Sequence, residues 1–156
     1  MPSEMQNFFL DTNVLVYFFD AADINKQQIA WSLLQNSTSK YVISTQVLTE
    51  FSNVALHKLK LTVPQLHLAI DKLSELPLVN IEVPALKAAA EISKAYQLSF
   101  YDSLIVASAE VAGCSRIVTE DLNNGQKIRG MEIWNPFATL ATGEIRSHPS
   151  AGKRRA

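Results

Sequence analysis

The sequence predicts one α/β domain built around a central, mainly parallel β-sheet. Short apolar segments typical of strands alternate with longer segments whose apolar residues recur at helical spacing. No tight hairpin signal joins the early strands, which favours helical crossovers between parallel strands. The chain has 156 residues, 47 % hydrophobic and 19 % charged, and this is enough for one hydrophobic core without disulfides.

The first half of the chain is predicted to hold three strands and three helices. A short apolar run ends at Asp11, and Asp23 can cap the first of these helices. Thr62 and Gln65 form a capping box at the start of another helix, which Pro77 closes. The expected strands are 8–10, 41–43 and 79–83, and the expected helices are 23–34, 47–59 and 62–77.

The second half is predicted to hold two further helices and two further strands. Pro84 opens an alanine-rich helix that runs to Tyr96. Ser99 begins a helix that is apolar nearly all round, and is therefore buried, and Gly113 ends it. The expected strands are 116–119 and 131–134.

Cysteine content and the absence of targeting signals predict a cytoplasmic protein. A single cysteine, Cys114, cannot form an internal disulfide, which favours a reducing compartment. The longest apolar run, 14–19, is too short to cross a bilayer, and the first residues lack the pattern of a secretory signal. We expect no association with a membrane.

Acidic residues stand at four places where a buried strand or helix begins or ends: Asp11, Glu50, Asp102 and the pair Glu120–Asp121. An unpaired buried charge costs several kcal/mol, so carboxylates normally avoid such places. In an open parallel sheet the carboxyl ends of the strands share one edge, where ligands bind. If the fold brings these acids together there, a divalent cation is the usual compensation. The pattern therefore predicts a site for a hard metal ion.

Each acid also has a simpler explanation. Asp11 can belong to a strand-to-helix turn, and Glu50 lies at the border of an apolar helix face, where solvated glutamates are common. Asp102 follows Ser99 by three residues and can act in a capping box at a helix N-terminus. The residues at 120–125 favour a loop by their types alone, so acids there need no functional explanation. Only the joint pattern favours the metal site.

The charge of the chain is uneven along its length. The apolar pattern ends near Ala138, which divides the chain into an expected domain at 1–137 and a basic tail at 138–156 that we expect to be unstructured. The chain has a net charge of −1 and the residues from 146 onward carry +4, so those before 146 carry −5. A nucleic-acid-binding protein usually has a basic surface. Two bound Mg²⁺ ions would cancel the four acids, so the acidic balance is weak evidence against such a substrate.

Four segments, taken in order, resemble those of a PIN domain, and the closing segment resembles that of VapC-type toxins from bacterial toxin–antitoxin pairs. The likeness covers residues 7–137. The segments are 8–17 (FFLDTNVLVY), 44–51 (STQVLTEF), 99–109 (SFYDSLIVASA) and 119–122 (TEDL), and the closing segment is 125–137 (GQKIRGMEIWNPF).

The resemblance implies a three-layer α/β/α sandwich and a ribonuclease that depends on Mg²⁺ or Mn²⁺. It implies an RNA substrate, a cognate antitoxin protein and a homodimer. Carried over by position, the metal-binding and catalytic acids are Asp11, Glu50, Asp102 and a fourth acid. Asp121 matches the fourth acid, and Glu120 is a less favoured candidate for it. The polar residues that support these acids are Asn13 and Thr119.

Two other classes of function remain open from the sequence. A phosphatase of the haloacid dehalogenase type also has an aspartate after its first strand, but it needs a second aspartate where this chain has Asn13. A non-catalytic module that binds RNA or a protein partner would keep the fold alone. Cation binding measured beside RNA cleavage separates the three classes.

Overall fold

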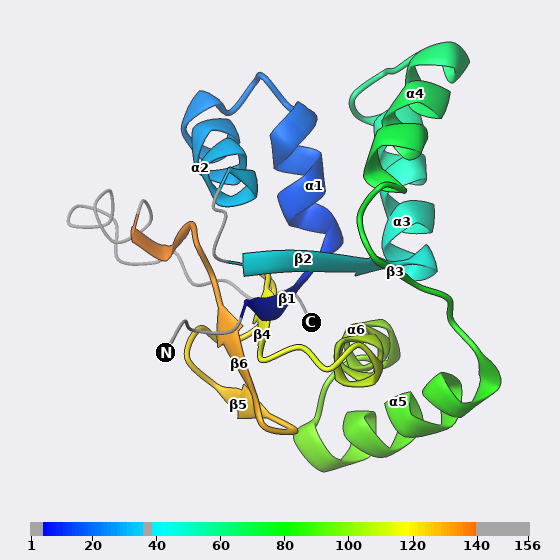
Figure 1. Ribbon diagram of the computed structural model, residues 1–156, viewed down its shortest axis with the longest axis vertical. Helices are drawn as coiled ribbons and strands as arrows, with labels where there is room; N and C mark the ends of the chain where they lie inside the picture. The colour runs from blue at the N-terminus through cyan, green and yellow to red at the C-terminus, as the bar shows by residue number, and fades with distance from the viewer. Residues whose placement is uncertain (1–4, 36–38, 140–156) are drawn as a thin grey trace.

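The computed structural model describes residues 5–35 and 39–139 and has a central β-sheet with helices on both faces (Figure 1). The predicted fold class is confirmed, since the sheet is mainly parallel and lies between two helical layers. The elements in chain order are β1 (Gln6–Leu10), α1 (Thr12–Phe19), α2 (Ile24–Leu34), β2 (Ser39–Ser44), α3 (Thr45–His57), α4 (Val63–Leu73), β3 (Leu78–Val79), α5 (Val83–Tyr96), α6 (Phe100–Val111), β4 (Arg116–Val118), β5 (Lys127–Ile128) and β6 (Met131–Trp134).

The strands follow the order β3-β2-β1-β4-β6-β5 across the sheet. All neighbouring strands are parallel except β5, which pairs with β6 in the antiparallel sense. From β1 the chain continues to β2 on one side, while β4 lies on the other side. The strand order therefore reverses between β1 and β4. In open α/β sheets, ligands bind beyond the carboxyl ends of the strands at such a reversal.

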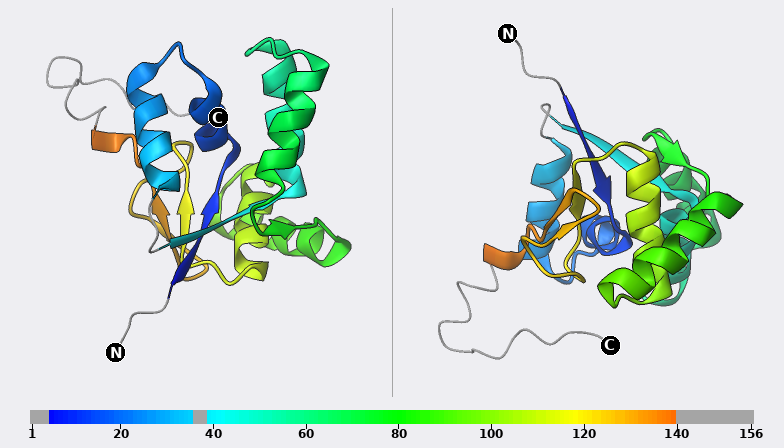
Figure 2. Two further views of the ribbon diagram at one scale, coloured as in Figure 1. Left: turned by 45° about the horizontal axis from the view of Figure 1, so that its top comes forward. Right: turned by 90° about the horizontal axis from the view of Figure 1, so that it is seen from below.

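The helices form one layer on each face of the sheet. Helices α1 to α4 lie over one face, and α5 and α6 lie together over the other (Figures 1 and 2). The hydrophobic core between the layers is continuous, and its centre consists of side chains from the middle strands that are fully buried. These include Phe9, Leu10, Ile43, Ile117 and Ile133.

Polar side chains fix the starts of most helices. The predicted capping box is confirmed: the Thr62 hydroxyl accepts from the Gln65 N–H, and the Gln65 side chain accepts from the Thr62 N–H. The predicted cap of α2 is also confirmed, because the Asp23 carboxylate accepts from the Lys26 N–H. Such caps satisfy backbone donors that a helix leaves without partners, and each stabilises it by about 1 kcal/mol.

The structure differs from the prediction at three elements and at the end of α4, which stops at Leu73 and not at Pro77. The strand expected at 79–83 is wrong, because β3 ends at Val79 and Val83 already belongs to α5. Pro84 suits the first turn of a helix, and the Ile81 N–H donates to the Thr45 hydroxyl instead of to a neighbouring strand. Helix α1 and strand β5 were not predicted at all.

The described residues cover the expected domain except 1–4 and 36–38, and they include only 138 and 139 of the expected tail. The prediction that this tail is unstructured therefore concerns residues outside the described part, apart from 138 and 139. Among the residues that the structure describes, no helix has the length and apolar character needed to cross a membrane.

Candidate active site

Asp11 and Thr119 lie side by side at the reversal of strand order. They directly follow β1 and β4, which pair in parallel register with Leu10 opposite Val118. The Asp11 N–H donates to the Val118 carbonyl oxygen over 3.0 Å and extends this ladder. Two segments more than 100 residues apart in the chain thus end at the same edge of the sheet.

Asp11 is a buried carboxylate that two donors hold in place. The Thr119 hydroxyl donates to its Oδ2 over 2.8 Å, and the Thr12 N–H donates to its Oδ1 over 2.7 Å. Burial raises the pKa of Asp11 to about 7, against the lowering effect of these two bonds, and the negative charges of Asp121 and Asp102 raise it further. These charge interactions place both acids near Asp11.

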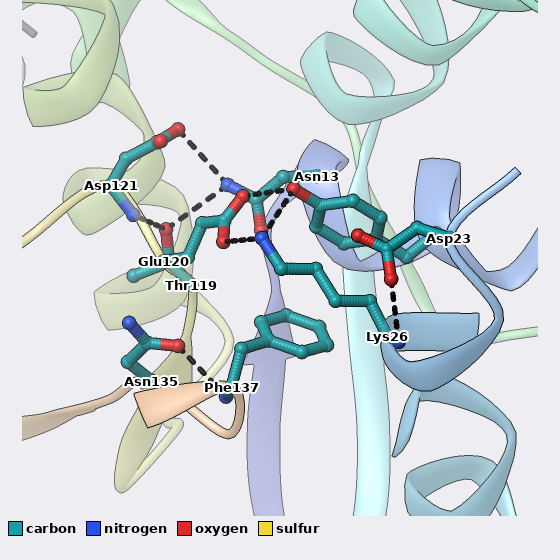
Figure 3. Close-up of polar contacts among 9 residues, drawn as sticks. Asn13, Asp23, Lys26, Thr119, Glu120, Asp121, Asn135 and Phe137 are labelled. Carbon is teal, nitrogen blue, oxygen red and sulfur yellow. Dashed lines mark hydrogen bonds and ion pairs between the residues drawn. The ribbon is translucent and has the colours of Figure 1, made fainter. Parts of the chain in front are cut away.

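Asp121 is positioned by Asn13 and by Thr119, which also contacts Asp11 (Figure 3). The Asn13 amide donates to its Oδ2 over 2.9 Å, and its own N–H donates to the Thr119 hydroxyl over 3.0 Å. Asn13 also donates to that hydroxyl over 3.4 Å. Thr119 therefore contacts both Asp11 and Asp121, so it fixes the separation of the two acids that follow β1 and β4.

Glu50 is held from two sides by residues that the sequence analysis missed. The Thr12 hydroxyl donates to its Oε1 over 2.9 Å, and the Gln46 amide donates to its Oε2 over 3.3 Å. Gln46 also donates to the Tyr101 carbonyl oxygen, which belongs to the first turn of α6. The spacing of four residues between Gln46 and Glu50 on one helix was the available signal, because such residues are neighbours on a helix face.

Asp102 comes to the site from the opposite helical layer. It lies in the first turn of α6, where the Ser99 hydroxyl caps the helix by accepting from the Asp102 N–H over 3.1 Å. The residue is half-buried. The cap and a place in the site therefore coexist, since the cap uses the backbone N–H of Asp102 and not its carboxylate.

The four acids predicted to bind a metal ion all line one cavity of about 350 Å³. Its wall includes side chains from α1, α3 and α6 and from the loop after β4. The lining residues are Asp11, Thr12, Gln46, Glu50, Ser99, Tyr101, Asp102, Ile105 and Asp121. The fold thus brings Asp11, Glu50, Asp102 and Asp121 together, with Asn13 and Thr119 bonded to them.

Glu120 is turned away from this cavity into a separate cluster (Figure 3). The Lys26 ammonium forms an ion pair with its Oε2 at 2.9 Å, and the Tyr17 hydroxyl donates to its Oε1. The Lys26 ammonium also lies 4.6 Å from the centre of the Tyr17 ring and 5.6 Å from that of Phe137. This cluster joins α1, α2 and the end of the domain to the loop that bears Asp121.

The donor set of the cavity suits a hard cation, because its charged ligands are all carboxylates. Two further buried oxygens lie on residues bonded to the acids of the cavity, Asn13 Oδ1 and Gln46 Oε1, and have no hydrogen-bond partner among the described residues. Within those residues, however, no group of three or more acidic, histidine or cysteine side chains is arranged to hold a metal ion as it stands. Mg²⁺ needs only one or two carboxylates and keeps several waters. The residues therefore fit a hydrated cation better than a closed metal cage.

Other reactive side chains lie outside the cavity. Burial raises the pKa of the Cys114 thiol to about 12, so it stays protonated at neutral pH and is a poor nucleophile. His57 and His67 do not line the cavity either. The carboxylates of Asp11, Glu50, Asp102 and Asp121 are therefore the candidate catalytic groups of the cavity.

The fold is similar to solved structures of bacterial toxins. One is a toxin–antitoxin complex from Klebsiella pneumoniae, with 20 % identity, a TM-score of 0.64, and coverage of 82 % of this chain and 96 % of that chain. A DNA-bound VapBC structure from Salmonella typhimurium has 21 % identity, a TM-score of 0.60, and coverage of 85 % and 99 %.

A third similar structure is a VapC toxin from Mycobacterium tuberculosis that is described as cleaving the sarcin–ricin loop. It has 18 % identity, a TM-score of 0.59, and coverage of 70 % of this chain and 86 % of that chain. No curated protein sequence matches the chain significantly. The family model of the PIN domain matches residues 8–127, which include all the acids of the cavity. The chain belongs to the PIN domain family.

Proposed function

We propose that this protein is an endoribonuclease that depends on Mg²⁺ or Mn²⁺ and cleaves RNA phosphodiester bonds. The observation that carries the proposal is the convergence of Asp11, Glu50, Asp102 and Asp121 on one cavity at the reversal of strand order. Membership of the PIN domain family supports nuclease chemistry. RNA is favoured as the substrate because a structurally similar toxin is described as cleaving the sarcin–ricin loop.

In this proposal the cation, when bound, supplies an activated water and stabilises negative charge on the phosphate. Asp11 and Asp121 would be its main protein ligands, and Thr119 fixes their separation. Glu50 and Asp102 would orient the attacking water or hold a second cation. Thr12 and Gln46 keep the Glu50 carboxylate pointing into the cavity, so it needs little rearrangement when substrate binds.

The biological setting we propose is that of the toxin in a type II toxin–antitoxin pair. It is supported by the similarity to toxin–antitoxin complexes from Klebsiella pneumoniae and Salmonella typhimurium. The proposal includes a cognate antitoxin as partner, a homodimer and a cytoplasmic location. It also includes a nuclease domain at 1–137 followed by a tail at 138–156.

A non-catalytic binding module is the second candidate. The observation that favours it is that no three of the described acids form a metal site as they stand. A module of this kind would bind RNA or a protein through the same face without cleaving RNA.

The experiment that separates the two candidates is cleavage of a structured RNA by the purified chain with Mn²⁺, with Mg²⁺ and with EDTA. The nuclease cleaves only with a metal ion, and titration calorimetry detects Mn²⁺ binding. RNA binding without cleavage at millimolar Mn²⁺ would support the binding module and end the nuclease proposal.

Replacement of Asp102 by asparagine tests the site itself. Asp102→Asn is expected to lower the cleavage rate at least 100-fold, because a charged oxygen at the cavity is lost. The melting temperature without metal should stay unchanged or rise, because repulsion among the acids decreases. Asp71→Asn, at an exposed position on α4, is the matched control and should keep full activity. Retained activity together with a small loss of stability would assign the Asp102 carboxylate only an electrostatic role at the N-terminus of α6.

A further inference from the structure

A second hollow opens beside the acid cavity and is not explained by metal binding. Its volume is about 620 Å³, within the range of small-molecule sites. Thr12, Glu50 and Asp121 line both hollows, so the two lie next to each other. We name this second hollow, between α1 and α3, the α1–α3 groove.

The walls of the α1–α3 groove are stripes on two helices that pack against each other. Asn13 and Tyr17 are four residues apart on α1, and Glu50 and Val54 are four apart on α3, so each pair lies on one helix face. Lys58, at the end of α3, continues the second stripe. It lies roughly 12 Å along the helix axis from Glu50, because each residue of a helix rises about 1.5 Å.

The chemistry of the α1–α3 groove changes along its length. Carboxylates lie at the end shared with the acid cavity. Apolar surface from Val16, Val54 and the Tyr17 ring forms the middle, with the exposed amide of Asn53 beside it. The exposed ammonium of Lys58 lies at the far end.

The Tyr17 ring is held in place before any ligand binds. It packs edge-on against the Phe137 ring at 5.0 Å, and its hydroxyl is bonded to Lys26 and Glu120. A fixed aromatic side chain is a suitable surface for a nucleobase, because every base presents an apolar face.

We propose that the α1–α3 groove binds one nucleotide of single-stranded RNA next to the phosphate that is cut. The base would lie against Val16, Tyr17 and Val54, its polar edge would meet Asn53, and the next phosphate would meet Lys58. This proposal rests on the proposed nuclease function and adds a subsite to it.

The shape and chemistry of the groove favour a nucleotide over a peptide helix. A helix in a groove needs a continuous apolar surface that accepts anchors over two turns or more. Here the apolar surface is a short patch of three side chains between charged groups of opposite sign. The Lys58 ammonium at one end of the groove can bind one phosphate, and the acid cavity at the other end can bind a second phosphate through a metal ion. This arrangement matches two successive phosphates of an RNA strand with one base between them.

Filling the groove tests the proposal directly. Asn53→Trp places a bulky ring in the groove from an exposed position, so folding is not at risk. We expect KM for a single-stranded RNA to rise about tenfold, and sequencing of the cut ends of a random RNA pool to show a changed preference at one flanking nucleotide. The Kd for Mn²⁺ should stay within twofold. Leu68→Trp, on the exposed face of α4, is the matched control and should change none of these.

Neutralising the cation gives an independent test. Lys58→Gln should raise KM about fivefold, and it should reduce the slope of log(kcat/KM) against log(salt concentration) by roughly 0.7, the value for one phosphate contact on a single strand. Lys87→Gln makes the same change of charge at an exposed position on α5 and should leave the slope unchanged.

The outcomes distinguish this proposal from the proposed function. If the parent protein binds Mn²⁺ but cleaves no RNA, the nuclease function fails and the subsite fails with it. If the parent cleaves RNA while Asn53→Trp and Lys58→Gln keep its KM, salt slope and cut sites, the subsite alone is overturned. Normal RNA kinetics in both variants, combined with loss of binding to a cognate antitoxin peptide, would assign the groove to a protein partner instead.

Discussion

Asp11 combines burial, two hydrogen bonds and two neighbouring negative charges, and burial dominates. Its raised pKa of about 7 means that near neutral pH both the protonated and the charged form of Asp11 are populated. A cation must displace that proton in order to bind. In the proposed nuclease this residue would couple metal binding to pH, and without metal it couples folding to pH.

The pH dependence of stability without metal has a definite sign. The folded protein holds the Asp11 proton up to a pH of about 7, whereas the unfolded chain releases it near 3.8. The stabilisation is thus complete below pH 3.8, decreases as pH rises, and is lost above about 7. In EDTA we expect the melting temperature to be several degrees higher at pH 5.5 than at pH 7.5. Asp11→Asn cannot titrate, so a variant that keeps the full difference would assign the effect to other groups.

The adjacent acids Glu120 and Asp121 are expected to have different roles. Glu120→Gln removes the charge that pairs with Lys26, so the melting temperature should fall by roughly 2–4 °C, while Mn²⁺ affinity and cleavage stay within about threefold. Asp121→Asn should keep stability and lose at least 100-fold in cleavage. Calorimetry with Mn²⁺ and thermal melts of both variants check this. The reverse pattern would make Glu120 the fourth metal-binding acid.

Among the helices, α2 and α4 were predictable from their polar caps, whereas α1 was not predicted although Asp11 caps it. Capping is local, since the cap residue and the donor lie within three residues of each other. In α1 the residues Val14, Leu15 and Val16 are all buried, so no polar face marks a helical period. The Asp11 side chain caps this helix while also facing the cavity, so one residue determines both the turn and the site.

The end of α5 provides a test of backbone strain. Gln97 ends this helix in the left-handed conformation, with φ of 59°, and its side chain is exposed. Glycine adopts this conformation without a steric penalty, so Gln97→Gly should stabilise the protein by roughly 0.5–1 kcal/mol. Denaturant unfolding measures the change. Gln97→Ala keeps the penalty and should give no gain, and an equal gain in both variants would show that strain is not the cause.

At the scale of the whole molecule, the acid cavity lies where both helical layers meet the sheet, because its acids come from α3, α6 and the ends of two strands. A cation that bridges these parts stabilises the folded state as a whole. Mg²⁺ at 100 times its Kd should add about 2.7 kcal/mol and raise the melting temperature by several degrees. Asp11→Asn should abolish the shift. An equal shift in parent and variant would mean that the cation binds elsewhere.

From the sequence alone, the α/β class, most helix boundaries and the four acids that line the cavity could be predicted. These depend on apolar period, on caps and on the position of acids at strand ends, all of which are local in the chain. The strand order, the bond of Thr12 to Glu50, and the turn of Glu120 away from Asp121 depend on the tertiary structure. Each of these depends on partners far apart in the sequence, such as Lys26 for Glu120, and side-chain direction is set only when those partners meet.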